Sequence, residues 1–204
     1  VEARRYSNNC IGDFFTEIGQ YANIYSTNWS WSPLFCDFDN DGNKDLHISN
    51  GYGKNSTHMD FIKFTVEQVI REKQGGEAMP RMSFVQKIPS TILKNYFFRN
   101  NGDSTFTNVT DAWGVEAPSL SNGAAYADLD NDGDMDLVVN NINEYAYVFR
   151  NNAEKNRENH YLKIRLKGSG LNPGAIGTRV DVTCRDRTFT QEFQPSRGYM
   201  SSMG

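Results

Sequence analysis

Carboxylates are concentrated in two short stretches of this chain, at a spacing that suits a hard divalent cation. The stretches cover residues 37–45 and 128–136, and each follows the pattern D-x-D-x-D-G-x-x-D. Calcium takes six to eight oxygen ligands at 2.3–2.6 Å, and alternate aspartates in one loop can supply several of them. The glycine at the sixth position permits the sharp turn that folds such a loop around an ion. The pattern therefore predicts cation-binding loops.

The expected ligands are the side chains at positions 1, 3, 5 and 9 of each loop and the backbone carbonyl at position 7. They are Asp37, Asp39, Asp41, the carbonyl of Asn43 and Asp45 in the first loop, and Asp128, Asp130, Asp132, the carbonyl of Asp134 and Asp136 in the second. An EF-hand is excluded, because position 12 is Ile48 or Val139 instead of a bidentate glutamate. We therefore predict two calcium sites, with a merely acidic turn as the alternative. Magnesium is disfavoured because it tolerates crowded, flexible protein cages poorly.

The charge balance of the whole chain agrees with bound cations. The 204 residues carry a formal charge of −4, and the two loops hold nine of the 25 acidic residues. Crowding like charges into nine residues is costly, and a divalent cation in each loop would remove that cost. Two such ions would bring the formal charge to zero.

The two loops belong to a unit that is written twice. Residues 15–18 match residues 106–109 at the same 91-residue offset that separates Asp37 from Asp128. Downstream, residues 96–101 recur as residues 147–152 after only 51 residues. The bare unit is therefore 51 residues long, and the first copy carries an insertion.

The insertion, roughly residues 53–95, has a helical pattern. Thr57 can cap a helix that has Asp60 in its first turn, and Gly75–Gly76 can end it. Apolar side chains recur at three- and four-residue steps, namely Phe61, Ile62, Phe64, Val66, Val69 and Ile70. We expect this amphipathic helix to pack its apolar face on the neighbouring sheet.

Short β-branched and aromatic segments flank each acidic loop, for example residues 124–127 and 136–140. A strand-rich unit of about 50 residues, repeated, is typical of a β-propeller blade. The predicted fold is all-β, a partial β-propeller with a helical insertion followed by a small β domain. The predicted divisions are a blade at 1–52, the insertion at 53–95, a second blade at 96–152 and the β domain at 153–204. A closed propeller needs at least four blades, so we expect this chain to be a fragment whose partners include further blades.

The second loop and its flank, residues 121–130 and onward, resemble FG-GAP/VCBS repeats. The C-terminal part resembles the ASPIC/UnbV domain at Asn159–Gly168, Asn172, Ala175–Val180 and Arg197–Ser202. The combination is similar to the cartilage acidic protein family, especially its large secreted bacterial members. The resemblance implies blades of the integrin-α type with calcium in a hairpin loop, and an ASPIC/UnbV domain cut short at Gly204.

Motifs of catalysis are missing from the sequence, so we expect no enzyme. His47, His58 and His160 fit no paired metal-ligand spacing, and His47 is expected to be a sheet position. Trp29 and Trp31 could stack on a sugar ring as an exposed platform, with Tyr25 and Trp113 nearby, although blade core packing is the favoured role. The surplus of basic residues in 159–204 lacks interleaved stacking aromatics, so no nucleic acid is expected.

These observations predict an extracellular, calcium-binding interaction or scaffold module that meets a protein or a surface. The alternatives are a glycan-binding component of a bacterial surface uptake system and an accessory domain of an enzyme. Millimolar extracellular calcium would keep weak sites filled, which favours secretion or the cell surface. No apolar run reaches the ~18 residues of a membrane span. Cys10, Cys36 and Cys184 are expected to be free thiols, with one disulfide as the alternative.

Overall fold

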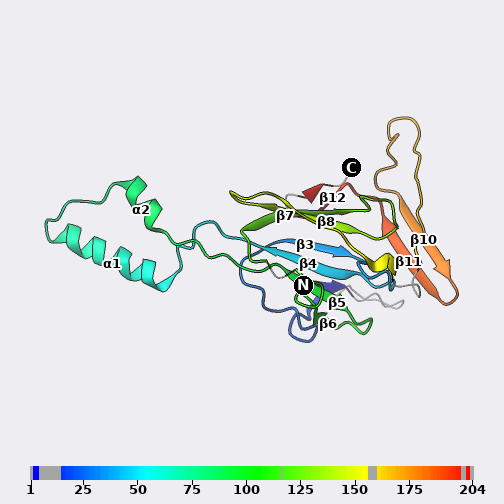
Figure 1. Cartoon of the computed structure of the whole chain (residues 1–204), viewed down its shortest axis with the longest axis horizontal. Coiled ribbons are helices and arrows are strands. Elements are labelled where there is room, and N and C mark those ends of the chain that lie inside the picture. The colour runs from blue at the N-terminus through cyan, green and yellow to red at the C-terminus, as the bar shows by residue number, and fades with distance from the viewer. Residues whose placement is uncertain (1, 5–14, 116, 156–159, 199–200, 203–204) are drawn as a thin grey trace.

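The computed structural model describes residues 2–4, 15–115, 117–155, 160–198 and 201–202. Within these ranges the chain forms antiparallel β-sheets and two α-helices (Figure 1). The predicted all-β class with a helical insertion is confirmed.

Two larger sheets form the body of the molecule. The first has the order β3-β4-β5-β6 and comprises β3 (Ser30–Cys36), β4 (Asp45–Asn50), β5 (Tyr96–Asn100) and β6 (Phe106–Asn108). The second has the order β7-β8-β9 and comprises β7 (Ser121–Ala127), β8 (Asp136–Asn141) and β9 (Tyr147–Phe149). Each acidic loop joins the first two strands of its sheet, and the register sets Cys36 opposite Asp45 and Ala127 opposite Asp136. Both loops are therefore hairpin connections, as the resemblance implied.

The strand pairing divides the chain differently from the predicted ranges. Residues 96–108, placed above in the second blade, complete the first sheet, because β5 pairs with β4 and β6 pairs with β5. The reason is that an internal repeat gives the length of a unit but not the residue at which its sheet begins. The first sheet thus starts near residue 30, and the insertion lies between its second and third strands.

The two sheets share one hydrophobic core. It contains Leu34 and Phe97 from the first sheet and Tyr126 and Leu137 from the second. The turn after β6 adds Val115, with Trp113 packed partly buried against it. Trp113 is therefore a packing residue, as favoured above.

The opposite face of the first sheet is covered by the equivalent turn of the preceding repeat. Ala22 and Ile24 pack there on Leu46, Ile48 and Phe98. In this turn the Ala22 amide donates to the carbonyl of Ile18 at 2.7 Å, and 91 residues later the Trp113 amide donates to that of Val109 at 2.8 Å. The repeat seen in the sequence is therefore also a repeat of backbone structure. Before this turn, β1 (Glu2–Arg4) and β2 (Phe15–Glu17) form a separate hairpin.

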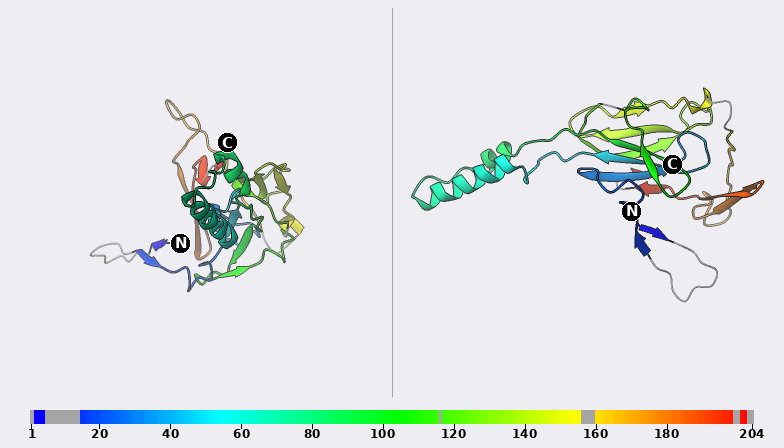
Figure 2. Two further views of the ribbon diagram at one scale, coloured as in Figure 1. Left: turned by 90° about the vertical axis from the view of Figure 1, so that its left-hand side faces the viewer. Right: turned by 90° about the horizontal axis from the view of Figure 1, so that it is seen from below.

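The helical insertion extends away from the sheets instead of covering one of them (Figures 1 and 2). It contains α1 (Met59–Lys73) and α2 (Arg81–Lys87). Phe61 and Phe64 of α1 pack on Phe84 of α2, with ring centroids 5.2 and 6.1 Å apart. The expected packing on the sheet is therefore wrong, because α2, which the helical pattern did not reveal, supplies the aromatic partner. The predicted cap is also displaced by one residue, since His58 and not Thr57 accepts the Asp60 amide.

The C-terminal part forms two hairpins around irregular chain. The first pairs β10 (Arg179–Cys184) with β11 (Arg187–Glu192), and the second pairs β12 (Ser196–Gly198) with β13 (Ser201–Ser202). The second hairpin lies beside β3 and β7. The strands β10 and β11 project beyond the end of the two larger sheets at which the acidic loops lie (Figure 1). A short 3-10 turn, η1 (Ala153–Lys155), follows β9.

Three sequence predictions concern single residues or spans. Cys36 is buried and Cys184 is an exposed free thiol, while Cys10 lies outside the described residues. His47 is a sheet position, fully buried between Leu34 and Phe97, and burial lowers its pKa to about 3.

Among the described helices, none has the length and apolar character needed to cross a membrane.

A buried polar network joins the two sheets at the end where the insertion leaves. The side-chain oxygen of Asn95 accepts the Asn50 amide at 2.8 Å, and its Nδ2 donates to Ser121 Oγ at 3.0 Å. Ser121 Oγ in turn donates to Asn141 Oδ1 at 2.7 Å. Asn50 and Asn141 occupy matching positions of the repeat, so the network locks both copies together.

Replacement of Asn95 by Ala should destabilise the chain by about 1–3 kcal/mol, because it leaves buried polar groups without partners. Urea unfolding of the full chain measures this cost. Asn28→Ala, at an exposed turn position, is the matched control and should stay within about 0.5 kcal/mol of the parent. Equal midpoints for the two variants would contradict the network's role.

Candidate metal centres

The first three aspartates of each loop converge as a single ion requires. One carboxylate oxygen from each of Asp37, Asp39 and Asp41 lies within 4.8 Å of the other two. The same is true of Asp128, Asp130 and Asp132 in the second loop. Two oxygens bound to one calcium at 2.3–2.6 Å can be at most about 5 Å apart, so both triplets fit that ion.

The aspartate at the ninth position of each loop lies outside the triplet and accepts backbone hydrogen bonds. Asp45 is fully buried, and its two oxygens accept the amides of Phe38 at 3.0 Å and Asn100 at 2.9 Å. The same contacts recur in the second loop, where Asp136 accepts the amides of Leu129 at 2.9 Å and Asn151 at 2.8 Å. These aspartates therefore tie the start of each loop to the end of the third strand, at Asn100 in β5 and at Asn151 just beyond β9.

The side chains at the seventh position differ between the loops, while their backbone carbonyls remain the predicted ligands in both. Asn43 accepts a hydrogen bond from Arg187 Nη2 at 3.1 Å through its side-chain oxygen. Asp134 is fully buried, and its carboxylate forms a further acidic group with Asp132 and Glu154. Glu154 lies on η1, far from the loop in sequence, so the loop pattern could not reveal it.

Two arginines outside the loop pattern also contact the loops. Arg99 Nε lies 3.2 Å from Asp39 Oδ2, and Arg150 Nε lies 2.8 Å from Asp130 Oδ2. The two arginines match each other at the 51-residue offset and pair with the same loop position. Their recurrence in the repeated segments 96–101 and 147–152 was the available signal. Both side chains are more than half exposed, so each pairing is weak compared with a bound divalent ion.

The negative charge of the loop carboxylates is unfavourable in the folded chain. Burial, reinforced by nearby aspartates, raises the pKa of Asp37 to about 6 and that of Asp45 to about 7. Burial also raises the pKa of Asp134 to about 7. A raised carboxyl pKa means that the folded chain disfavours the negative charge, and a bound cation would relieve this. Asp128 Oδ1 is buried without a hydrogen-bond partner, and a cation held by the loop would satisfy it.

The C-terminal part contacts the second loop through an aromatic ring and a cation. A Cβ at Gly133, where φ is +97°, would overlap the ring of Tyr161. Lys163 Nζ lies 3.1 Å from Asp128 Oδ2 and 2.9 Å from Asn131 Oδ1. Glycine is thus needed at the sixth position both for the backbone angle and for the ring.

The first loop meets an equivalent pair of side chains from the β10–β11 hairpin. A Cβ at Gly42, where φ is +86°, would overlap the ring of Phe189. Arg187 stacks on that ring at 5.1 Å and donates to the carbonyl of Asp41 at 3.4 Å. Both loops are therefore parts of the surface on which the C-terminal part lies.

The two tryptophans of the predicted aromatic platform, Trp29 and Trp31, make different contacts. Trp29 precedes β3, stays 40 % exposed and stacks on Tyr52 with ring centroids 4.6 Å apart. Trp31 lies within β3, where its indole N–H donates to the carbonyl of Gly51. Tyr25 is exposed. The stacked pair available to a ligand is therefore Trp29 with Tyr52.

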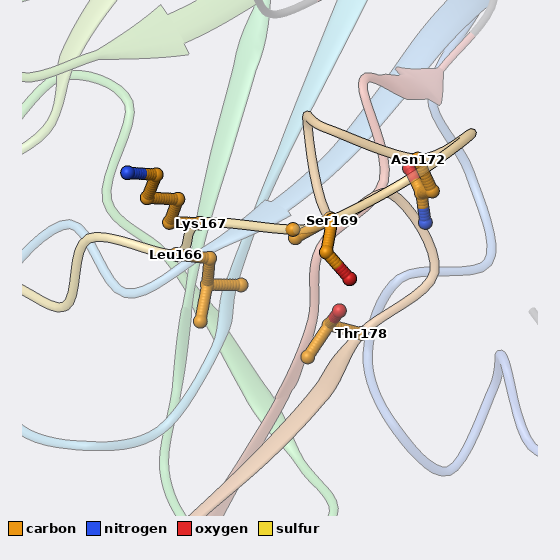
Figure 3. A pocket seen from close by; sticks show the side chains of 7 residues that line it. Leu166, Lys167, Ser169, Asn172 and Thr178 are labelled. Atoms are coloured by element: carbon orange, nitrogen blue, oxygen red, sulfur yellow. The ribbon is translucent and has the colours of Figure 1, made fainter.

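Two cavities accompany these features. One, of about 310 Å³, lies between the sheets and is lined by Phe38, Trp113, Leu137 and Arg150 among others. The other, of about 300 Å³, lies in the C-terminal part, where the hydroxyls of Ser169 and Thr178 point toward one another and the Lys167 amine points away (Figure 3).

Comparison with family models matches two segments of the chain. A model described as an FG-GAP-like repeat matches residues 90–139, and one described as ASPIC and UnbV matches residues 168–204. A search of curated proteins gives no match. The chain thus carries an FG-GAP-like repeat followed by an ASPIC and UnbV domain, which confirms the predicted architecture and indicates a repeat or interaction module. FG-GAP repeats often bind calcium, and the acidic groups described above could hold a metal.

Without calcium, the chain should become more stable as the pH falls. The pKa of Asp37 is raised from 3.8 to about 6, and that of Asp45 from 3.8 to about 7. Between pH 3.8 and these raised values, the folded state therefore binds more protons than the unfolded state. Stability then decreases as pH rises through this window. We expect a higher melting temperature in chelator at about pH 5.5 than at about pH 8.

With calcium the trend should reverse, because protons compete with the metal for the same carboxylates. Asp37→Asn removes one of the titrating groups and should reduce the pH dependence measured in chelator. A wild-type melting temperature in chelator that is flat or rises with pH would be the opposite of what the buried carboxyls require.

Proposed function

We propose that this chain is a calcium-binding interaction or scaffold module and not an enzyme. The observation that carries the proposal is the pair of aspartate triplets, each with oxygens within 4.8 Å, at matching hairpin positions of two repeated sheets. The presence of an FG-GAP-like repeat across the second loop supports the same assignment.

The donor chemistry favours calcium over other metals. The acidic groups found among the described residues contain only carboxylates, whereas zinc and copper sites usually include imidazole or thiolate. Magnesium demands a small, near-ideal octahedron and keeps several waters, which suits these crowded loops less well. An ion surrounded by protein oxygens leaves no position for a substrate, so the loops support binding instead of metal-assisted catalysis.

Calcium in these loops would neutralise charge and fix the surface of the C-terminal part. The aspartates at positions 1, 3 and 5 would hold the ion, while Asp45 and Asp136 keep each loop joined to the third strand. Tyr161 and Phe189 lie on the two loop glycines, so the conformation of the loops is transmitted directly to the C-terminal part of the chain. The ion's role is therefore structural and sets the geometry of a contact surface.

The proposed setting is outside the cell, secreted or at the cell surface. Weak loops of this kind are filled by calcium near millimolar concentration, which the extracellular space provides. The proposed partners are a protein or a glycan at the cell surface and further blades of the parent propeller. Nucleic acid is not among them, because the basic side chains identified at the loops face aspartates.

Calcium should raise the melting temperature of the full chain strongly relative to excess chelator. Two independent sites filled at ~100 times their dissociation constants stabilise by roughly 5 kcal/mol. The double variant Asp37→Asn/Asp128→Asn should lose most of this gain, because each substitution removes the first ligand of a triplet. Asp103→Asn, an exposed turn position outside both triplets, should keep it. A gain that magnesium reproduces, or that survives in the double variant, would contradict the proposal.

Glycan binding is a second candidate, favoured by the exposed stack of Trp29 on Tyr52. Flat aromatic faces pack well on sugar rings, and this pair lies at the end of the first sheet away from its acidic loop.

On this candidate function, Trp29→Ala should abolish retention on immobilised neutral oligosaccharides without changing the melting temperature. Trp31→Ala should instead lower the melting temperature, because its indole N–H bonds to the Gly51 carbonyl within the fold. Retention that is absent in the parent chain, or unchanged in Trp29→Ala, would rule out this platform.

A further inference from the structure

A third acidic group stands beside the second loop and shares Asp132 with its triplet. We propose that Asp132, Asp134 and Glu154 form an additional divalent-cation site, so that the second loop holds two ions and the first loop one. This inference rests on the proposed calcium binding of the loops and adds a site that the loop pattern does not contain.

The group is assembled from two segments that are distant in sequence. One carboxylate oxygen from each of Asp132, Asp134 and Glu154 lies within 4.8 Å of the other two. The Glu154 amide donates to Asp134 Oδ2 at 3.2 Å, which holds η1 against the loop. The separation fits one calcium ion, whose ligand oxygens lie at most about 5 Å apart.

Two oxygens of this group lack any partner although they are buried. Asp134 is completely inaccessible, and its Oδ1 has no hydrogen bond. Glu154 Oε2 is also buried without a partner. Buried polar atoms are nearly always satisfied, and an unpaired buried carboxylate is especially costly. A cation at this point would satisfy both oxygens at once.

The charge around the second loop exceeds what one calcium ion can balance. Six carboxylates gather there, namely Asp128, Asp130, Asp132, Asp134, Asp136 and Glu154. Among the residues that the structure describes, the basic side chains that contact them are Arg150 and Lys163. Arg150 reaches Glu154 only at 3.9 Å and is 61 % exposed, so it compensates that carboxylate weakly. One divalent ion would leave the cluster negative, and a second brings it to balance.

The first loop provides an internal comparison in which the extra site is missing. Its seventh position is Asn43, which carries no charge, where the second loop has Asp134. The residue that matches Glu154 at the 51-residue offset is Asp103, whose Oδ1 accepts both the amide and the hydroxyl of Thr105. That carboxylate is therefore already satisfied within its own turn. The two copies share a backbone but differ in ligands.

The test is the number of calcium ions bound by the full chain, counted by native mass spectrometry and by titration calorimetry with calcium chloride as the only ligand. We expect three ions in the wild type. Glu154→Gln and Asp134→Asn should each bind two, and Asp103→Asn, the matched control in the first copy, should bind three. The two ions that the variants retain also show that the variants are folded, because each remaining loop must be formed to hold its ion.

Each outcome decides between the two proposals. Two ions in the wild type, or three in Glu154→Gln, would overturn the additional site and leave the calcium-binding loops standing. No bound calcium in the wild type would overturn both. A third ion that is lost in Asp103→Asn as well as in Glu154→Gln would show nonspecific charge attraction and would also overturn the site.

Discussion

The constraint on which the rest of this structure depends is the crowding of carboxylates at two hairpin connections. Strand pairing fixes the ends of each loop, since Cys36 lies opposite Asp45 and Ala127 opposite Asp136. The aspartates between them cannot move apart without breaking the sheet, so their repulsion must be balanced by positive charge. Arg99, Arg150 and Lys163 supply part of it from other segments. The remainder is the physical basis for the cation that we propose in each loop.

The same constraint organises the contact between the two parts of the chain. Because the loops need glycine at the sixth position, each presents a bare backbone surface on which a ring of the C-terminal part can lie. The insertion extends from the other end of the sheets, where a buried network of asparagine and serine side chains joins the two copies. The two larger sheets thus have a charged end, where the acidic loops contact the C-terminal part. Their other end is held together by hydrogen bonds between neutral side chains.

The two copies are alike in backbone and unlike in electrostatics. The turn that precedes each sheet repeats its hydrogen bonds, and the buried aspartate at position nine repeats its two contacts. The seventh position does not repeat, since Asn43 meets Arg187 while Asp134 is buried beside Glu154. A repeated fold therefore does not imply repeated chemistry, and each loop has to be judged by the charges that surround it.

The sequence by itself determined the repeat, the hairpin nature of the loops, the convergence of their first three aspartates and the all-β class. These features are local, because spacing along one strand or one loop decides them. Only the tertiary structure decided that residues 96–108 complete the first sheet, that α1 packs on α2, and that Glu154 and Lys163 reach the second loop. Those contacts join segments that are distant in sequence, and no local spacing carries the information about which distant segments meet.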